Sequence, residues 1–133
     1  DAIYRNAKLR EALNELVHPR VFADFKDWCD QKRALGKSYV IKEAAILFES
    51  GADKTVDLVI GVMAPLSLRL KRVIDRDGGS EETVKLRIQS QMPQEDWAER
   101  CDYLINNDGN VVLEEQVLTI HEALMARSLG NRK

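Results

Sequence analysis

The chain has little cysteine, little histidine and little net charge, and each scarcity excludes a class of function. Cys29 and Cys101 lie far apart and form no Cys-x-x-Cys pair, so we expect reduced thiols in the core and no zinc site. The two histidines cannot form a three-histidine metal site, and no Ser/His/Asp or Cys/His arrangement favours hydrolysis. A formal net charge of −2 gives no general attraction to nucleic acid or membranes, so any anion binding must be local.

Long hydrophobic runs and an amino-terminal signal segment are also missing. The longest apolar runs, Ala44 to Phe48 and Leu58 to Ala64, are too short to span a bilayer, so we expect a cytoplasmic location. With 133 residues, of which 44% are hydrophobic, the chain has the size of one ordinary domain. Because it begins at Asp1 without a Met, directly in helical periodicity, we expect that an upstream segment has been removed.

Helical periodicity predicts two helices before residue 36. The first carries its apolar residues at helical spacing and ends near His18-Pro19, a pair that we expect to join two helices. The second has an apolar stripe that favours packing over ligand binding and stops at Gly36. The apolar residues of the two helices are Leu9, Leu13, Leu16 and Val17, then Val21, Phe22, Phe25 and Trp28.

Three strand-like runs follow, and helices separate them. The runs begin at Tyr39, at Val56 and at Cys101, and the second is almost continuously apolar, as expected for a strand covered on both faces. Strand, helix and strand in this order imply a parallel sheet. The expected fold class is therefore α/β, with three parallel strands and flanking helices.

Local signals place the helices around these strands. Pro65 opens one helix, and Ser80 is a credible N-cap for another that we expect to run to about Met92, since Glu81 and Glu82 complement its dipole. Pro93 begins a short helical turn. A final helix is marked by Leu113, Val117, Ile120 and Leu124.

The segment from Arg69 to Pro93 is the most informative part of the sequence. It places Arg69, Arg72, Arg76 and Arg87 around Gly78-Gly79, directly after the buried strand. A guanidinium presents a planar fork of donors that matches phosphate oxygens, so several on one hinged segment suit a flap over a polyphosphate. The alternative is that these charges belong to solvated helix faces.

Two further groups of polar residues follow predicted strands, where parallel sheets bind ligands. Glu43 lies in an apolar run and could face a magnesium-bound phosphate or form a buried salt bridge, whereas Glu49 favours a solvated or loop-capping role. The turn Asn107-Asp108-Gly109 could be an ordinary turn or cradle an adenine ring. His18 could cap a helix junction or donate to a substrate phosphate or ribose.

Several segments together resemble the dephospho-coenzyme A kinase family in order and spacing, over nearly the whole chain. The matching segments are Leu13–Pro19, Glu43–Glu49, Val56–Asp57, Arg72, Arg76–Gly78, Arg87–Pro93 and Asp102–Asn107. The resemblance corresponds to the later part of a family member and implies a P-loop kinase fold with a parallel-sheet core and a helical lid. It also implies transfer of the ATP γ-phosphoryl group, with Mg²⁺, to the ribose 3′-hydroxyl of dephospho-coenzyme A, the final step of coenzyme A biosynthesis.

Site roles follow from the same resemblance, residue by residue. Arg72 and Arg76 match arginines at the base of the lid, and Arg87 matches the lid arginine that would reach the ATP phosphates. We expect Arg87 and Arg72 to be catalytic and Arg76 to bind substrate together with His18 and Glu43. His18 matches a His-Pro motif beside the acceptor substrate. Asn107 and Gly109 fall where the adenine loop should be.

The sequence departs from the family pattern in two places. Ala45 stands where many members have proline, and no Gly-x-x-x-x-Gly-Lys-Ser/Thr loop is present, so these 133 residues alone should be catalytically incompetent. We expect a substrate-side helical region at 1–38, an α/β core at 39–77 and 101–133, and a lid at 78–100. The alternatives are a non-catalytic coenzyme- or nucleotide-binding module and an interaction protein; the oligomeric state stays open.

Overall fold

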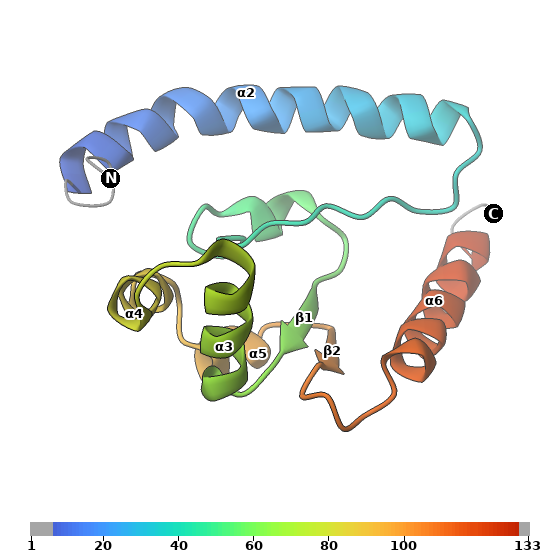
Figure 1. Cartoon of the computed structure of the whole chain (residues 1–133). Helices are drawn as coiled ribbons and strands as arrows, with labels where there is room; N and C mark the ends of the chain where they lie inside the picture. Colours follow the sequence, from blue (N-terminus) through green and yellow to red (C-terminus); the bar gives the residue numbers. More distant parts are fainter. Residues whose placement is uncertain (1–6, 131–133) are drawn as a thin grey trace. The chain divides into compact units, whose positions relative to one another are not determined.

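The computed structural model describes residues 7–130, which divide into two compact units (Figure 1). One unit falls within residues 1–43 and 128–133, and the other spans 44–127. The predicted division into substrate-side region, core and lid is finer than this division into two units, and it stays a prediction. None of the helices in residues 7–130 combines the length and the apolar composition that crossing a bilayer requires.

The first unit is built on α2, a single helix from Ala7 to Ala34. The prediction of two helices joined at His18-Pro19 is therefore wrong, because Pro19 lies inside a continuous helix. Proline removes one helical hydrogen bond, but the freed carbonyl lies on an exposed stretch where water can satisfy it. The helix ends as predicted at Gly36, whose φ of 72° is left-handed and whose N–H donates to Arg33 O at 2.9 Å.

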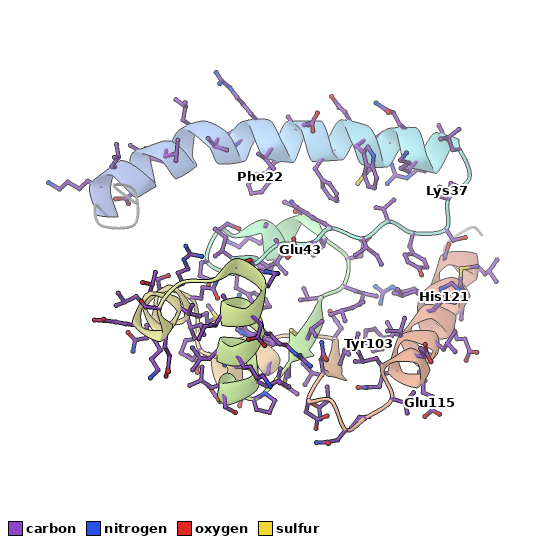
Figure 2. The ribbon with its side chains drawn as sticks, viewed as in Figure 1. Phe22, Lys37, Glu43, Tyr103, Glu115 and His121 are labelled. Atoms are coloured by element: carbon purple, nitrogen blue, oxygen red, sulfur yellow. The ribbon has the colours of Figure 1, made fainter. Side chains whose placement is uncertain are left out.

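After α2 the chain runs extended to Glu43 without forming a strand. The prediction of a strand beginning at Tyr39 is wrong here, because a strand requires a hydrogen-bonded neighbour and residues 7–130 offer this segment none. Side chains hold it instead: the Lys42 ammonium lies 4.9 Å and 4.5 Å from the ring centroids of Phe22 and Phe25. Figure 2 shows Phe22 pointing from α2 toward this segment.

The second unit contains two parallel strands, β1 (Ile60–Met63) and β2 (Tyr103–Asn106). Ile60 is paired with Tyr103 and Met63 with Asn106, so the two strands end together. The described residues thus form two of the three predicted strands, and the α/β class with a parallel sheet is confirmed. The apolar run from Val56 forms a strand only from Ile60, because β2 is no longer than four residues and pairs with no more of it.

Helices α3 (Leu66–Asp77), α4 (Glu81–Gln89) and α5 (Gln94–Ala98) connect the strands. The predicted starts are confirmed: Pro65 and Pro93 precede α3 and α5, and the Ser80 hydroxyl accepts from Thr83 N–H at 3.3 Å. Helix α4 ends at Gln89, three residues before the predicted Met92. The Ser90 hydroxyl donates to Arg87 O at 2.7 Å and competes for the last helical carbonyls.

The second unit also contains the short 3₁₀ helix η1 (Ala52–Thr55) and α6 (Leu113–Gly130) as far as residue 127. Both cysteines are free, as predicted, but each is only half-buried. Burial raises the pKa of the Cys101 thiol. The buried apolar side chains of the described residues are Ala52, Ala64, Leu70, Val84 and Ile120.

Candidate functional site

Polar groups gather at the edge of the sheet where β1 and β2 end. Beyond the last paired residues, the Asn107 N–H donates to Met63 O at 2.8 Å, which carries the strand pairing one step further. In parallel α/β folds ligands bind at this carboxyl edge, because loops and helix N-termini converge there. The candidate site is therefore built from α3, which follows β1, and from the loop after β2.

Arg72 and Asn107, predicted to act on phosphate and adenine respectively, are in direct contact at this edge. The Arg72 Nη1 donates to Asn107 O at 2.9 Å, from the second turn of α3 to the loop 35 residues further along the chain. Among the described residues this bond engages one guanidinium nitrogen of Arg72, and the other N–H groups are available to an anion. The structure thus joins two predicted site residues that the sequence keeps far apart.

Arg76 and Arg87 lie near one carboxylate. Arg76 holds Asp77 in a bidentate pair, with Nε–Oδ1 and Nη2–Oδ2 distances of 2.6 Å and 2.8 Å. The hydrogen bond from Arg76 is the main cause of a lowered pKa of Asp77, to which the positive charge of Arg87 also contributes. Among the described residues the Arg87 side chain has no hydrogen bond or ion pair, so this exposed guanidinium is available to a ligand.

The loop after β2 is organised by Asp108. Its Oδ1 accepts from Asn110 N–H at 2.8 Å and from Val111 N–H at 3.2 Å, and its Oδ2 accepts from Asn106 Nδ2 at 3.1 Å. The backbone bond from Asn110 is the largest cause of a lowered pKa of Asp108. Gly109 follows with a φ of 89°, and no atom lies within 4 Å of where its Cβ would be. The turn is therefore rigid, with open space beside it.

Helix α4, which carries Arg87, is attached differently at its two ends. At its start Gly78 and Gly79 have φ values of 69° and 100°, backbone conformations that other residues rarely adopt. Beyond its end the Glu49 carboxylate accepts from Met92 N–H at 2.7 Å. This bond confirms the loop-capping role predicted for Glu49.

The segment after α4 is held by Arg100 as well. Its guanidinium lies 4.0 Å from the ring centroid of Phe48, and its Nη2 approaches the Asp53 carboxylate at 3.3 Å. A cation on an aromatic face next to a carboxylate is a stable arrangement even when partly exposed. Arg100 and Glu49 therefore fix the carboxyl-terminal side of the predicted lid to the chain around η1.

His18 and Glu43 belong to the unit within residues 1–43. The His18 backbone lies inside α2, and its side chain lies outside the described part of the structure. Glu43 is exposed, so the alternative of a buried salt bridge is wrong; its position at the end of the extended segment leaves it open to water. The same unit contains an open groove of about 410 Å³ lined by Val21, Asp24, Phe25, Trp28, Ile41 and Lys42.

Side-chain amides that the sequence did not single out also cap this edge of the sheet. Gln94 Oε1 accepts from Ala64 N–H at 3.3 Å just after β1, and Gln116 Oε1 accepts from Asn106 N–H at 2.8 Å at the end of β2. The sequence does contain a signal that could have identified Gln116. It stands at helical spacing between Leu113 and Ile120, on the apolar face of the last helix. A lone polar residue on such a face needs a buried partner.

Among the side chains that the structure describes, no three of the types His, Cys, Asp and Glu gather closely enough to hold a metal ion. Arg72 brings a positive charge to the sheet edge, where Asp108 supplies a carboxylate in the loop after β2.

Comparison with known proteins identifies the family. A family profile described as dephospho-CoA kinase matches residues 1–112. The dephospho-CoA kinase of Chlorobaculum tepidum is 44% identical over 115 residues, which are 86% of this chain and 55% of that protein. The enzyme of Bacteroides fragilis is 41% identical over 108 residues, which are 81% of this chain and 52% of that protein.

Solved structures agree with the sequence comparison. A crystal structure of a Thermus thermophilus protein matches with a TM-score of 0.78 at 30% identity, over 92% of this chain and 62% of that one. The dephospho-CoA kinase from Campylobacter jejuni matches with a TM-score of 0.59 at 30% identity, over 97% and 63%. The chain thus spans about half the length of the curated relatives named above. On the evidence of sequence and fold together, the chain belongs to the dephospho-CoA kinase family.

Proposed function

We propose that this chain works within a dephospho-CoA kinase, which transfers the γ-phosphoryl group of ATP to the ribose 3′-hydroxyl of dephospho-coenzyme A. The sequence contains no phosphate-binding loop of the Gly-x-x-x-x-Gly-Lys-Ser/Thr type, so sequence outside these 133 residues supplies it. Magnesium arrives with ATP as part of the substrate, and the reaction takes place in the cytoplasm. The term full-length protein below means the chain together with that sequence.

The observation that carries this proposal is the hydrogen bond of 2.9 Å from Arg72 to Asn107 O. A nucleoside triphosphate needs a base site and a cationic phosphate site on the same edge of the sheet. The bond supports such a pairing, since it ties the α3 arginine to the loop where the base would lie. Family membership supplies the identity of the nucleotide.

Phosphoryl transfer depends mainly on positioning and on stabilising negative charge. The acceptor oxygen forms a bond to the γ-phosphorus, the bond to the β–γ bridging oxygen breaks, ADP leaves and the hydroxyl proton is released. Arg87, whose guanidinium makes no hydrogen bond among the described residues, and the N–H groups of Arg72 that Asn107 does not engage would stabilise the charge that develops on the transferred group. Arg76 would exchange Asp77 for a substrate phosphate.

The acceptor, dephospho-coenzyme A, is proposed to bind on the side of residues 1–38, with His18 and Glu43 at its polar end. The aromatic groove along α2 supports this assignment, because Phe25 and Trp28 offer flat apolar surface and Lys42 offers a cation. The Lys42 Nζ is buried against the Phe22 and Phe25 rings and has no hydrogen-bond partner among the described residues, so a ligand anion that reached it would supply the missing acceptor.

Arginine substitutions in the full-length protein test the proposal. We expect Arg87→Ala to lower kcat by roughly 1,000-fold, as loss of an arginine finger does, and Arg72→Ala to lower it while also raising KM for ATP. Arg127→Ala is the matched control, because Arg127 is exposed on α6 and has no hydrogen bond or ion pair within residues 7–130. An unchanged kcat for Arg87→Ala would refute the catalytic role.

A non-catalytic nucleotide- or coenzyme-binding module is the second candidate, favoured by the absence of the phosphate-binding loop from these residues. The coding sequence upstream of Asp1 separates the two: a Gly-rich loop ending in Lys-Ser or Lys-Thr supports the kinase. Calorimetry with ATP and with dephospho-coenzyme A, followed by a turnover assay, gives the second test. Binding of both ligands without turnover in the full-length protein supports the module.

A further inference from the structure

The outer edge of β2 is completed by a side chain. At Asn106, the last residue of β2, the backbone N–H donates to Gln116 Oε1 at 2.8 Å and the carbonyl accepts from Gln116 Nε2 at 3.1 Å. Both groups point away from β1, because backbone groups alternate sides along a strand and Asn107 N–H is the one that bonds to Met63 O. The Gln116 amide therefore does for Asn106 what a neighbouring strand would do.

The same amide also reaches the far end of the loop. Gln116 Nε2 donates to Val112 O at 3.3 Å, in addition to Asn106 O. Asn106 and Val112 flank the loop of residues 107–111, so one side chain ties both of its ends together. The orientation of the amide is determined by its partners, since exchanging its oxygen and nitrogen would place donor against donor and acceptor against acceptor.

The loop held in this way already has its interior arranged. Asp108 accepts from Asn110 and Val111 N–H groups, and Arg72 donates to Asn107 O. With the ends fixed by Gln116, few backbone torsions remain for a ligand to order. A loop that is pre-arranged binds with a smaller loss of conformational entropy than one that must be ordered by its ligand.

We propose that Gln116 is a positioning residue for the nucleotide base. It touches no substrate and acts by holding Asn106, and with it the loop Asn107–Gly109, in the geometry that receives the base. This role rests on the proposed function, which assigns that loop to adenine. Its consequence is selective: loss of the amide should weaken ATP binding and leave the binding of dephospho-coenzyme A unaffected.

The test uses two substitutions in the full-length protein. Gln116→Met keeps the length of the side chain and removes both donor and acceptor, whereas Gln116→Glu keeps an acceptor for Asn106 N–H and loses the donor to the two carbonyls. Glu122→Met is the matched control, because Glu122 is exposed on α6, the helix that carries Gln116, and its side chain has no hydrogen bond or ion pair within the described residues.

We expect Gln116→Met to raise KM for ATP by about tenfold, with KM for dephospho-coenzyme A changed by less than about twofold. Hydrogen exchange at the Asn106 amide should accelerate in Gln116→Met and stay slow in Gln116→Glu, a difference that general destabilisation would not produce. Glu122→Met should change neither measurement.

Three outcomes would overturn the positioning role. They are an unchanged KM for ATP in Gln116→Met, an equal rise in both KM values, and Asn106 exchange that is the same in the wild type and in Gln116→Met. Failure of the proposed function looks different, because the wild-type protein would then show no ATP-dependent turnover. The exchange measurement does not require turnover, so it would still decide whether Gln116 holds the loop.

Discussion

Replacement of Gly61 by alanine tests the packing of α5 against the sheet. A Cβ built on Gly61 would lie 2.5 Å from Trp97 Cζ3, 2.8 Å from Cys101 Sγ and 3.0 Å from Leu104 Cδ2. Ordinary carbon contacts are about 3.5 to 4.0 Å, so the Trp97 ring would have to move by roughly 1 Å. The three atoms come from α5, from the residues after it and from β2, and no single rotamer change relieves all three contacts.

The loss of stability in Gly61→Ala follows from these three contacts. Inserting a methyl group into a well-packed site destabilises by about 1 to 3 kcal/mol, and contact on three sides places Gly61→Ala toward the upper end. Gly130→Ala is the matched control, because a Cβ there meets no atom within 4 Å and the residue lies in α6. Alanine is the better helix former, so this control should be neutral or stabilising by up to about 1 kcal/mol.

Urea unfolding of the full-length protein, followed by tryptophan fluorescence, measures the difference. Gly61→Ala should lower the midpoint at an unchanged slope, and Gly130→Ala should not lower it. The double variant Gly61→Ala/Trp97→Phe should lose less than the sum of the two single variants, because the smaller ring removes the clashing atom. A midpoint for Gly61→Ala equal to that of the wild type would refute the packing argument.

Two further predictions concern the site. Glu49→Ala removes the acceptor for Met92 N–H, so hydrogen exchange at the Met92 amide should accelerate by about fivefold. Glu49→Gln keeps an oxygen there and should change the exchange rate less. Equal exchange in the wild type and in both variants would contradict the bond. The hydrogen bond from Asn110 N–H is the main cause of the lowered pKa of Asp108. The ionised carboxylate therefore holds the turn fully at any pH above the ordinary aspartate pKa of about 3.9. The turn should loosen as the pH falls through the lower pKa that Asp108 has in the folded protein. The chemical shift of the Asn110 amide, followed against pH, measures the titration of Asp108. A transition centred at or above the ordinary aspartate pKa would contradict a lowered pKa.

Local signals predicted the helix boundaries well, because a cap depends on residues within one turn of it. Pro65, Pro93 and Ser80 start their helices as predicted, and Gly36 follows the end of α2. The local rule failed at Pro19, which lies inside α2. A proline within a helix removes one hydrogen bond, and at an exposed position water replaces it.

Strands were predicted less well, because a strand exists only when paired. The run from Tyr39 has the composition of a strand, yet it is extended chain without a neighbour in residues 7–130. The run from Val56 is apolar throughout, and only the four residues opposite β2 form a strand. Sequence pattern therefore indicated which segments could pair, and the partner determined which of them did.

The sequence by itself determined the family, the α/β class and the identity of the arginines, since these depend on residue types in a given order. Tertiary structure decided which of them meet: Arg72 reaches Asn107 O, and Gln116 closes the loop after β2. These contacts join residues 35 and 10 positions apart. No periodicity or capping rule reaches across such separations, because the distance between two side chains there is set by the pairing of β1 with β2 and by the helices that follow them.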